Sequence, residues 1–279
     1  MNKKYIISGI GVGDTGTSKF LEKLLEYNKS YTVITPGKHV KVKTLLKKRE
    51  FFRLAGGLIY YVLNMVLFKC RCFVIKNSEV ILLHPQTIGL KTTIRLVNCN
   101  AKIKYYVLDN FLFCKQSYNF NKNTRGECIK CIHDTADKEC FSFPVRYSNK
   151  TYNAFRNCVI YSEKIEFYFQ NSNHLLLHKK ISSALPATVI GLETSELEAS
   201  EITPIESRGN YIVFHGDLID AKGFDLLNML IAGLPEILFI IPDIDERLSG
   251  FDNVKMECAR WDTGLSEQVK NAKLVLLKG

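Results

Sequence analysis

The sequence has little proline, no internal repeat and no stretch of biased composition. Its 279 residues include 7 prolines and 17 glycines, too few for a collagen-like or a disordered chain. Hydrophobic residues make up 46% of the sequence, so the chain can bury a core instead of relying on disulfides. The length allows one large or two moderate domains, and we expect two.

The sequence also lacks a signal peptide and a long uninterrupted apolar run. Met1–Lys4 is basic, but the apolar stretch after it is rich in glycine and has no cleavage site. The longest apolar run, Leu54–Phe68, is interrupted by two glycines and an asparagine and is shorter than the ~18 to 20 residues of a membrane-spanning helix. We therefore expect no membrane span and a cytoplasmic location, where the nine cysteines stay reduced.

Basic residues exceed acidic ones. The 38 Lys and Arg against 28 Asp and Glu give a net charge of +10, which favours anionic partners. Seven of the basic residues fall in Lys38–Arg53, directly before the apolar run. A helix of this pattern can lie on an anionic membrane surface, which predicts a peripheral protein at the inner face of the plasma membrane. Alternatively, the helix packs against the core with a solvated basic face. We expect no nucleic acid partner, because no aromatic platform accompanies the charges.

Short apolar segments alternate with segments of helical periodicity. The chain opens with a strand at Lys4–Gly9, a helix around Lys19–Leu25 and a strand at Tyr31–Thr35. This alternation predicts an α/β fold in which helices cover a parallel sheet. Further strands are predicted at Val80–Leu83, Lys104–Leu108 and Asn157–Tyr161, and helices at Leu45–Phe68 and Thr92–Val97.

The same alternation resumes after an acidic segment. Glu193–Glu206 contains five acidic residues and a proline and is interpreted as a linker. The predicted domains are residues 1–192, with a cysteine-rich insertion at 109–145, and residues 210–279, joined by the linker 193–209. In the second domain, strands are predicted at Tyr211–Phe214, Ile237–Ile241, Asn253–Glu257 and Leu274–Leu277, and helices at Gly223–Ile231 and Leu265–Asn271.

Three glycines follow the first predicted strand. Gly11, Gly13 and Gly16 match the pattern G-x-G-x-x-G before a helix, where glycines let the backbone approach a phosphate. A dinucleotide site needs an acidic residue about 20 positions later, and Thr35–Lys38 has none, so NAD is not expected. The alternative is a tight turn that only packs the strand against the helix.

His84 directly follows the predicted strand Val80–Leu83. Open α/β sheets bind their ligands at this end of a strand, and a histidine there can act on a leaving group or a developing charge. The alternative is a structural histidine. In the second domain, Lys222 and Gly223 lie at a strand-to-helix turn, where a lysine can meet a diphosphate or simply remain solvated.

Four cysteines are clustered in the insertion. Cys114, Cys128, Cys131 and Cys140 contain one C-x-x-C pair, which is typical of zinc ligands, and four thiolates would complete a structural site. The alternative is a loop with unliganded cysteines. His133 or Asp134 could replace a cysteine, and the remaining cysteines (Cys70, Cys72, Cys99, Cys158 and Cys258) are predicted to be buried in the core.

Taken together, the segments resemble family 4 glycosyltransferases, which have the two-domain GT-B fold. The resemblance rests on Ser8–Gly16, His84–Pro85, Asp109–Cys114, Gly216–Gly223 and Leu234–Glu236, and it covers most of the chain. It implies two Rossmann-like domains, the second of them partial, and a retaining transfer of sugar in cell-surface polysaccharide synthesis. The implied partners are a nucleotide-sugar donor and a saccharide or lipid-linked acceptor.

The resemblance also implies roles for individual residues. His84 would be catalytic and Asp109 would lie on the acceptor side. The sugar transfer itself would require no metal, so any zinc at the cysteine cluster would be structural. The donor would bind through Gly11, Gly13, Gly16, Lys222 and Gly223.

The chain departs from the family at two places. Asp217 stands where the family has a phosphate-binding arginine, and the sequence ends before the family's glutamate-x7-glutamate segment. We therefore expect a chain truncated within the donor domain. The alternative function is a catalytically inactive glycan- or membrane-binding module, and a third is a cytosolic nucleotide- or nucleic-acid-binding protein.

Overall fold

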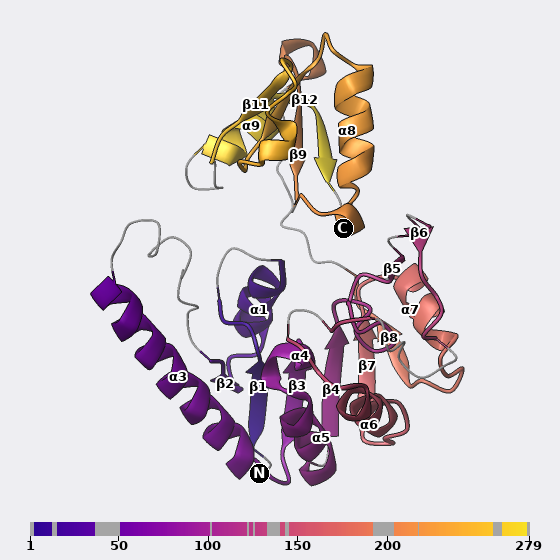
Figure 1. The fold of residues 1–279 in the computed structure, drawn as a ribbon. Coiled ribbons are helices and arrows are strands. Elements are labelled where there is room, and N and C mark those ends of the chain that lie inside the picture. The colour runs from indigo at the N-terminus through magenta and orange to yellow at the C-terminus, as the bar shows by residue number, and fades with distance from the viewer. Residues whose placement is uncertain are drawn as a thin grey trace. The chain divides into compact units, whose positions relative to one another are not determined.

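The structure, a computed structural model, divides into two units (Figure 1). Unit 1 comprises residues 1–119 and 128–192, and unit 2 comprises residues 120–127 and 193–279. Each unit is an α/β structure built on its own parallel sheet. The residues described are 3–12, 16–36, 51–100, 102–121, 123–124, 126–132, 140–142, 145–191, 204–216, 218–258 and 264–277.

The sheet of unit 1 has six strands in the order β2-β1-β3-β4-β7-β8, and every neighbouring pair is parallel. Its strands are short and mostly buried, as expected of a sheet covered on both faces. They span Lys4–Ser8 (β1), Thr32–Ile34 (β2), Glu79–Leu83 (β3), Lys102–Val107 (β4), Ile165–Phe169 (β7) and Ala187–Val189 (β8).

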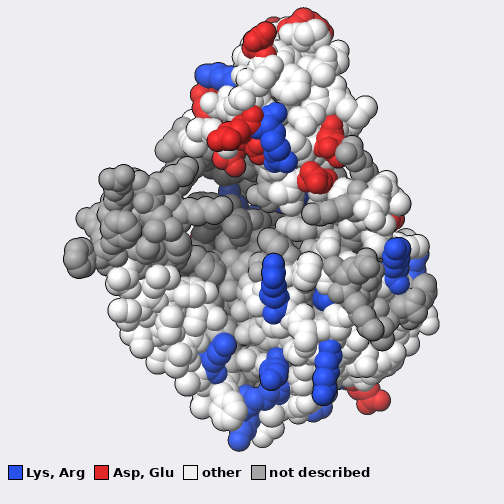
Figure 2. Space-filling view, viewed as in Figure 1, with Lys and Arg blue, Asp and Glu red and all other residues white. Residues whose placement is uncertain are grey.

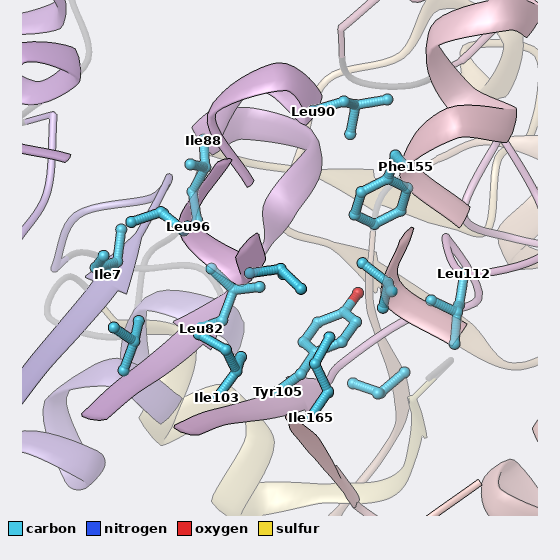
Figure 3. Close-up of a cluster of buried hydrophobic side chains, with 14 of the residues drawn as sticks. Ile7, Leu82, Ile88, Leu90, Leu96, Ile103, Tyr105, Leu112, Phe155 and Ile165 are labelled. Atoms are coloured by element: carbon cyan, nitrogen blue, oxygen red, sulfur yellow. The ribbon is translucent and has the colours of Figure 1, made fainter. Parts of the chain in front are cut away.

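Helices cover both faces of this sheet. On one face, side chains of α3, α5 and α6 pack on alternate strand residues such as Ile7 and Leu82. Figure 3 shows Leu90 and Leu96 of α5 and Phe155 of α6 in this cluster. On the other face, Leu21 of α1 packs on Ile6 and Ile81. The helices span Gly16–Tyr27 (α1), Phe51–Val74 (α3), Pro85–Ile88 (α4), Leu90–Cys99 (α5), Asn149–Ile160 (α6) and Ser172–Lys179 (α7).

Unit 2 repeats this architecture on a smaller scale. Its four strands are parallel in the order β11-β10-β9-β12, with α8 packed on one face and α9 near the other. Its main elements are Gly209–His215 (β9), Phe224–Gly233 (α8), Leu238–Ile241 (β10), Val254–Met256 (β11), Ser266–Asn271 (α9) and Ala272–Leu277 (β12). Short 3-10 turns at Ile205–Ser207, Asp220–Lys222 and Glu246–Leu248, and the hairpin of Phe120–Asn121 (β5) and Gly126–Glu127 (β6), complete it.

The parallel α/β prediction is confirmed, but the strand predicted at Asn157–Tyr161 is wrong. These residues lie in or directly after α6. Ser148 caps this helix by accepting a hydrogen bond from the Thr151 amide at 3.2 Å. The helix then buries apolar side chains at helical spacing, Tyr152, Phe155 and Val159 among them. The segment Cys158–Ile160 only resembles a strand when it is read without the turns before it.

The prediction that the apolar run Leu54–Phe68 is too short for a membrane-spanning helix is also wrong. Helix α3 continues past Phe68 to Val74, so Ala55–Val74 is 20 residues long with a mean hydropathy of 1.4, which satisfies the length and composition of a membrane span. Only 11% of its most apolar window is buried, so most of this part of the helix lies outside the core of unit 1. The segment Lys38–Glu50 lies outside the described residues.

Candidate functional site

The carboxyl edge of the unit 1 sheet is the candidate site. The chain leaves β1 toward β2 on one side and later adds β3 on the other, so the strand order reverses between β1 and β3. Open α/β sheets bind ligands outside the carboxyl ends of strands at such a point. The loops that follow β1, β3 and β4 carry Gly11, His84 and Asp109, so three predicted site residues lie at one edge of one sheet.

A glycine is required at this edge, but at a position that the sequence pattern did not single out. A Cβ atom on Gly9 would collide with Thr87 Oγ1 and the Ile88 amide, so β1 and α4 can approach each other only because residue 9 is glycine. Gly16, by contrast, begins α1 and a Cβ there would meet nothing within 4 Å. Gly13 lies outside the described residues, so the glycine loop remains a prediction.

His84 has an unusual backbone conformation. Its φ of 54° and ψ of 61° are in the left-handed region, which non-glycine residues rarely adopt and which is enriched at functional sites. The ring Nδ1 lies 2.7 Å from Thr87 Oγ1, and Thr87 Oγ1 donates to the His84 carbonyl oxygen at 3.1 Å. Because the hydroxyl has one proton, both contacts are satisfied when Nδ1 carries the ring proton, which leaves Nε2 as an acceptor.

The His84 side chain is neutral at physiological pH. Burial lowers its pKa to about 4, because the charged imidazolium is poorly solvated there. A neutral ring can accept a proton or orient a hydroxyl at Nε2, but it cannot supply a fixed positive charge.

Asp109 is linked to His84 through α4. The Gln86 side-chain amide donates to Asp109 Oδ2, and the Phe111 amide donates to Oδ1 at 2.9 Å. Burial raises the pKa of the Asp109 carboxyl to about 6 despite these hydrogen bonds. Gln86 is itself 1% exposed, and among the described residues its Oε1 has no hydrogen-bond partner. The edge therefore holds a carboxyl group that exchanges a proton near neutral pH.

Two histidines that the sequence reasoning did not single out lie on α7, after β7. His174 and His178 are one helical turn apart, with ring centroids 4.5 Å apart, and both pack against Phe169. Burial lowers the pKa of His174, which a hydrogen bond with the Asp109 backbone partly offsets. His178 is 0% exposed and burial lowers its pKa to about 3. The repeat of histidine at positions i and i+4 of a capped helix was the available signal.

The predicted zinc ligands are partly described. Cys114 and Cys131 are buried, whereas Cys128 and Cys140 are half-buried. Burial, together with the nearby thiols of Cys131 and Cys140, raises the pKa of Cys114 to about 11, so these three lie within electrostatic range. Within the ranges that the structure describes, no three His, Cys, Asp or Glu side chains are arranged to hold a metal. Residues 133–139 lie outside them, so the zinc site remains a prediction.

The prediction of core cysteines holds for only one of the other five. Cys72 is buried, Cys99 and Cys158 are half-buried, and Cys70 and Cys258 are exposed. Cys70 is exposed because it lies on the outward side of α3, which the sequence reasoning did not anticipate.

In unit 2, Lys222 and Gly223 lie at the corresponding edge. The strand order reverses between β9 and β12, and the loop that follows β9 carries both residues. Gly223 has a φ of 78°, caps α8 and allows the left-handed turn from Lys222 into the helix. Asp217 lies outside the described residues.

A second cation contacts this turn from the loop between β10 and β11. The guanidinium of Arg247 lies 3.7 Å from the ring centroid of Phe224, the first residue of α8, and donates to the Leu218 carbonyl oxygen at 2.6 Å. It is also paired with Asp245 at 2.6 Å, which lowers the pKa of that carboxyl to about 2. Arg247 therefore holds the turn in place, a role that arises from the fold and that no local motif indicates.

One cavity lies far from these residues in unit 1. It has a volume of about 480 Å³ and is lined by residues that include Lys102, Glu163 and Ala187. These residues lie at the amino ends of β4, β7 and β8, opposite to the edge that carries His84. The position argues against a ligand site of the usual α/β kind.

Comparisons with models of protein families, with curated proteins and with solved structures gave no match to this chain.

Proposed function

We propose that the chain is a glycosyltransferase of the GT-B type, which moves a sugar from a nucleotide-sugar donor to a saccharide or lipid-linked acceptor in cell-surface polysaccharide synthesis. The observation that supports it best is the placement of His84. The residue lies at the switch point of a parallel sheet, in a left-handed conformation, with a neutral ring. A second parallel α/β unit, with Lys222 at its own switch point, agrees with a two-domain enzyme.

In this proposal each of the site residues has a separate role in the transfer. The neutral His84 ring orients the transferred sugar through Nε2, and Asp109, held by Gln86, lies on the acceptor side. Lys222 offsets the negative charge that develops on the diphosphate as the glycosidic bond breaks. Gly11, Gly13, Gly16 and Gly223 let the backbone approach the donor. No metal takes part in the transfer, and zinc at the cysteine cluster would serve the fold alone.

The test is release of nucleoside diphosphate from a panel of UDP-, GDP- and ADP-sugars by the full chain, with and without oligosaccharide acceptors. His84→Asn keeps the left-handed backbone accessible and removes the ring. We expect it to lower the rate by about 100-fold or more. We expect Lys222→Ala to raise the donor KM about tenfold, whereas Lys255→Ala, the matched change at an exposed lysine of β11, leaves it unchanged.

The competing function is a catalytically inactive module that binds glycan or membrane lipid, and the exposed apolar face of α3 favours it. Binding of nucleotide sugars by calorimetry separates the two. If no nucleotide sugar binds and none is turned over, the enzyme proposal fails and the binding module remains.

A further inference from the structure

Helix α3 presents an apolar face away from unit 1. Six large apolar side chains on its middle turns are 42% to 64% exposed, namely Leu58, Ile59, Val62, Leu63, Val66 and Leu67. At 100° per residue these positions cover about half of the helix circumference. In the view of Figure 1, α3 lies along the edge of unit 1 that carries β2, and the surface of this region is largely free of charged residues (Figure 2).

The opposite side of the same helix fastens it to unit 1. Phe68 and Cys72 are 1% and 0% exposed and belong to the core cluster of the sheet. Arg95 of α5 donates to the Cys72 carbonyl oxygen at 3.0 Å and lies over the Phe73 ring at 4.1 Å. The last turns of α3 are therefore fixed to the domain, and the turns before Phe68 extend their apolar face outward.

A soluble helix normally turns its apolar side toward the core and its polar side toward water. In α3 the segment Leu58–Leu67 has no charged residue on any side, and its large apolar side chains face solvent. Contiguous exposed apolar surface of this size marks an interface with another protein or with a membrane. The charge around the helix distinguishes these two.

The excess of positive charge lies in residues 1–192, the part of the sequence that contains α3. Residues 1–192 carry 30 Lys and Arg against 12 Asp and Glu, whereas residues 193–279 carry 8 against 16. Seven of the basic residues fall in Lys38–Arg53, immediately before the apolar face, and Lys69 and Arg71 follow it. An apolar helix face between basic residues complements a bilayer with anionic headgroups.

We propose that α3 docks unit 1 on an anionic lipid surface, with its apolar face at the boundary between headgroups and acyl chains. The helix lies in the plane of the membrane and does not span it. Because Phe68 and Cys72 are held in the core, only the turns of α3 before Phe68, residues 51–67, are free to enter lipid. At 1.5 Å per residue these 17 residues reach about 26 Å, less than the ~30 Å of a hydrocarbon core. The proposal does not depend on sugar transfer.

The experiment is flotation of the full chain with phosphatidylcholine vesicles that contain 0% or 30% phosphatidylglycerol. We expect binding to the anionic vesicles, at least tenfold weaker binding to the neutral ones, and a further loss at 500 mM NaCl. Leu63→Glu with Val66→Glu places two charges on the apolar face and should weaken binding at least tenfold. The matched control is Leu226→Glu with Met229→Glu on α8, whose side chains are 60% and 71% exposed, and it should bind as the wild type does.

Three outcomes overturn the proposal. Undiminished binding of the Leu63→Glu, Val66→Glu variant, with circular dichroism showing it folded, removes α3 from the interface; Leu63→Ala with Val66→Ala gives the same test without new charge. Retention in the membrane after extraction with alkaline carbonate shows a spanning helix. If the wild type does not bind vesicles but is a dimer, and the Leu63→Glu, Val66→Glu variant is a monomer, a second copy of the chain covers α3.

Discussion

Replacement of Gly9 by alanine is expected to destabilise unit 1 by about 2 to 3 kcal/mol, the cost of forcing atoms into a packed contact. The new Cβ would collide with the Thr87 hydroxyl and with the Ile88 backbone, and a backbone atom cannot rotate away as a side chain can. Relief requires α4 to move from β1. Since His84 precedes α4 and bonds to Thr87, the movement would also disturb the His84 ring.

Gly16→Ala provides the control in the same segment of chain. A Cβ at this first residue of α1 meets no atom within 4 Å, so we expect stability to be unchanged or to rise by up to ~1 kcal/mol through helix propensity. Urea unfolding followed by circular dichroism measures both variants, and amide exchange in β1 and β3 assigns the loss to unit 1. Equal stability of the two variants would contradict the predicted contact.

Acidification is expected to destabilise unit 1 through His178. This side chain is fully buried among aromatic rings and its pKa of about 3 in the folded chain lies below the ~6.5 of an unfolded histidine. The folded chain therefore binds the proton less tightly, and stability falls as the pH drops below about 6.5. At pH 5 the loss from this one residue is about 2 kcal/mol. The lowered pKa of His84 acts in the same direction, whereas the raised pKa of Asp109 opposes both below pH 6.

His178→Leu separates the contribution of this residue. Its Nε2 has no hydrogen-bond partner among the described residues, and its Nδ1 bonds to the His174 carbonyl oxygen at 2.9 Å, so an apolar side chain of similar size should cost no more than about 1 kcal/mol at pH 7.5. Between pH 7.5 and pH 5 the stability of the variant relative to the wild type should rise by about 2 kcal/mol, because the variant has no imidazole to protonate. Urea midpoints at the two pH values measure the difference, and an unchanged pH dependence would show that His178 does not control it.

Much of the fold could be predicted from the sequence because its strands are apolar and short. The β-α-β opening and all six elements predicted in residues 210–279 occur, within a few residues of the expected bounds. The strand predicted at Asn157–Tyr161 rested on three apolar residues, Cys158–Ile160, but the serine cap at Ser148 begins a helix that includes them. The strand β7 was not predicted, although its apolar residues alternate with Glu166 and Tyr168, a spacing that is typical of a strand.

Of the candidate site, the sequence could predict positions but not contacts. His84 lies directly after a strand and Lys222 lies in a strand-to-helix turn, as expected, since the flanking elements place both residues. Three contacts of the site join segments that are distant in sequence and meet only after folding. They are the close approach of Gly9 to α4, the hydrogen bond from Gln86 to Asp109 and the hydrogen bond from Arg247 to Leu218. Such contacts have no local signature.

The uneven distribution of charge also gives the chain an electrical polarity. Its first 192 residues carry an excess of 18 positive charges and the remainder an excess of 8 negative ones. A negatively charged surface attracts residues 1–192 and repels residues 193–279. The chain is therefore oriented during its approach to an anionic surface, so a larger fraction of encounters brings residues 1–192 into contact with that surface.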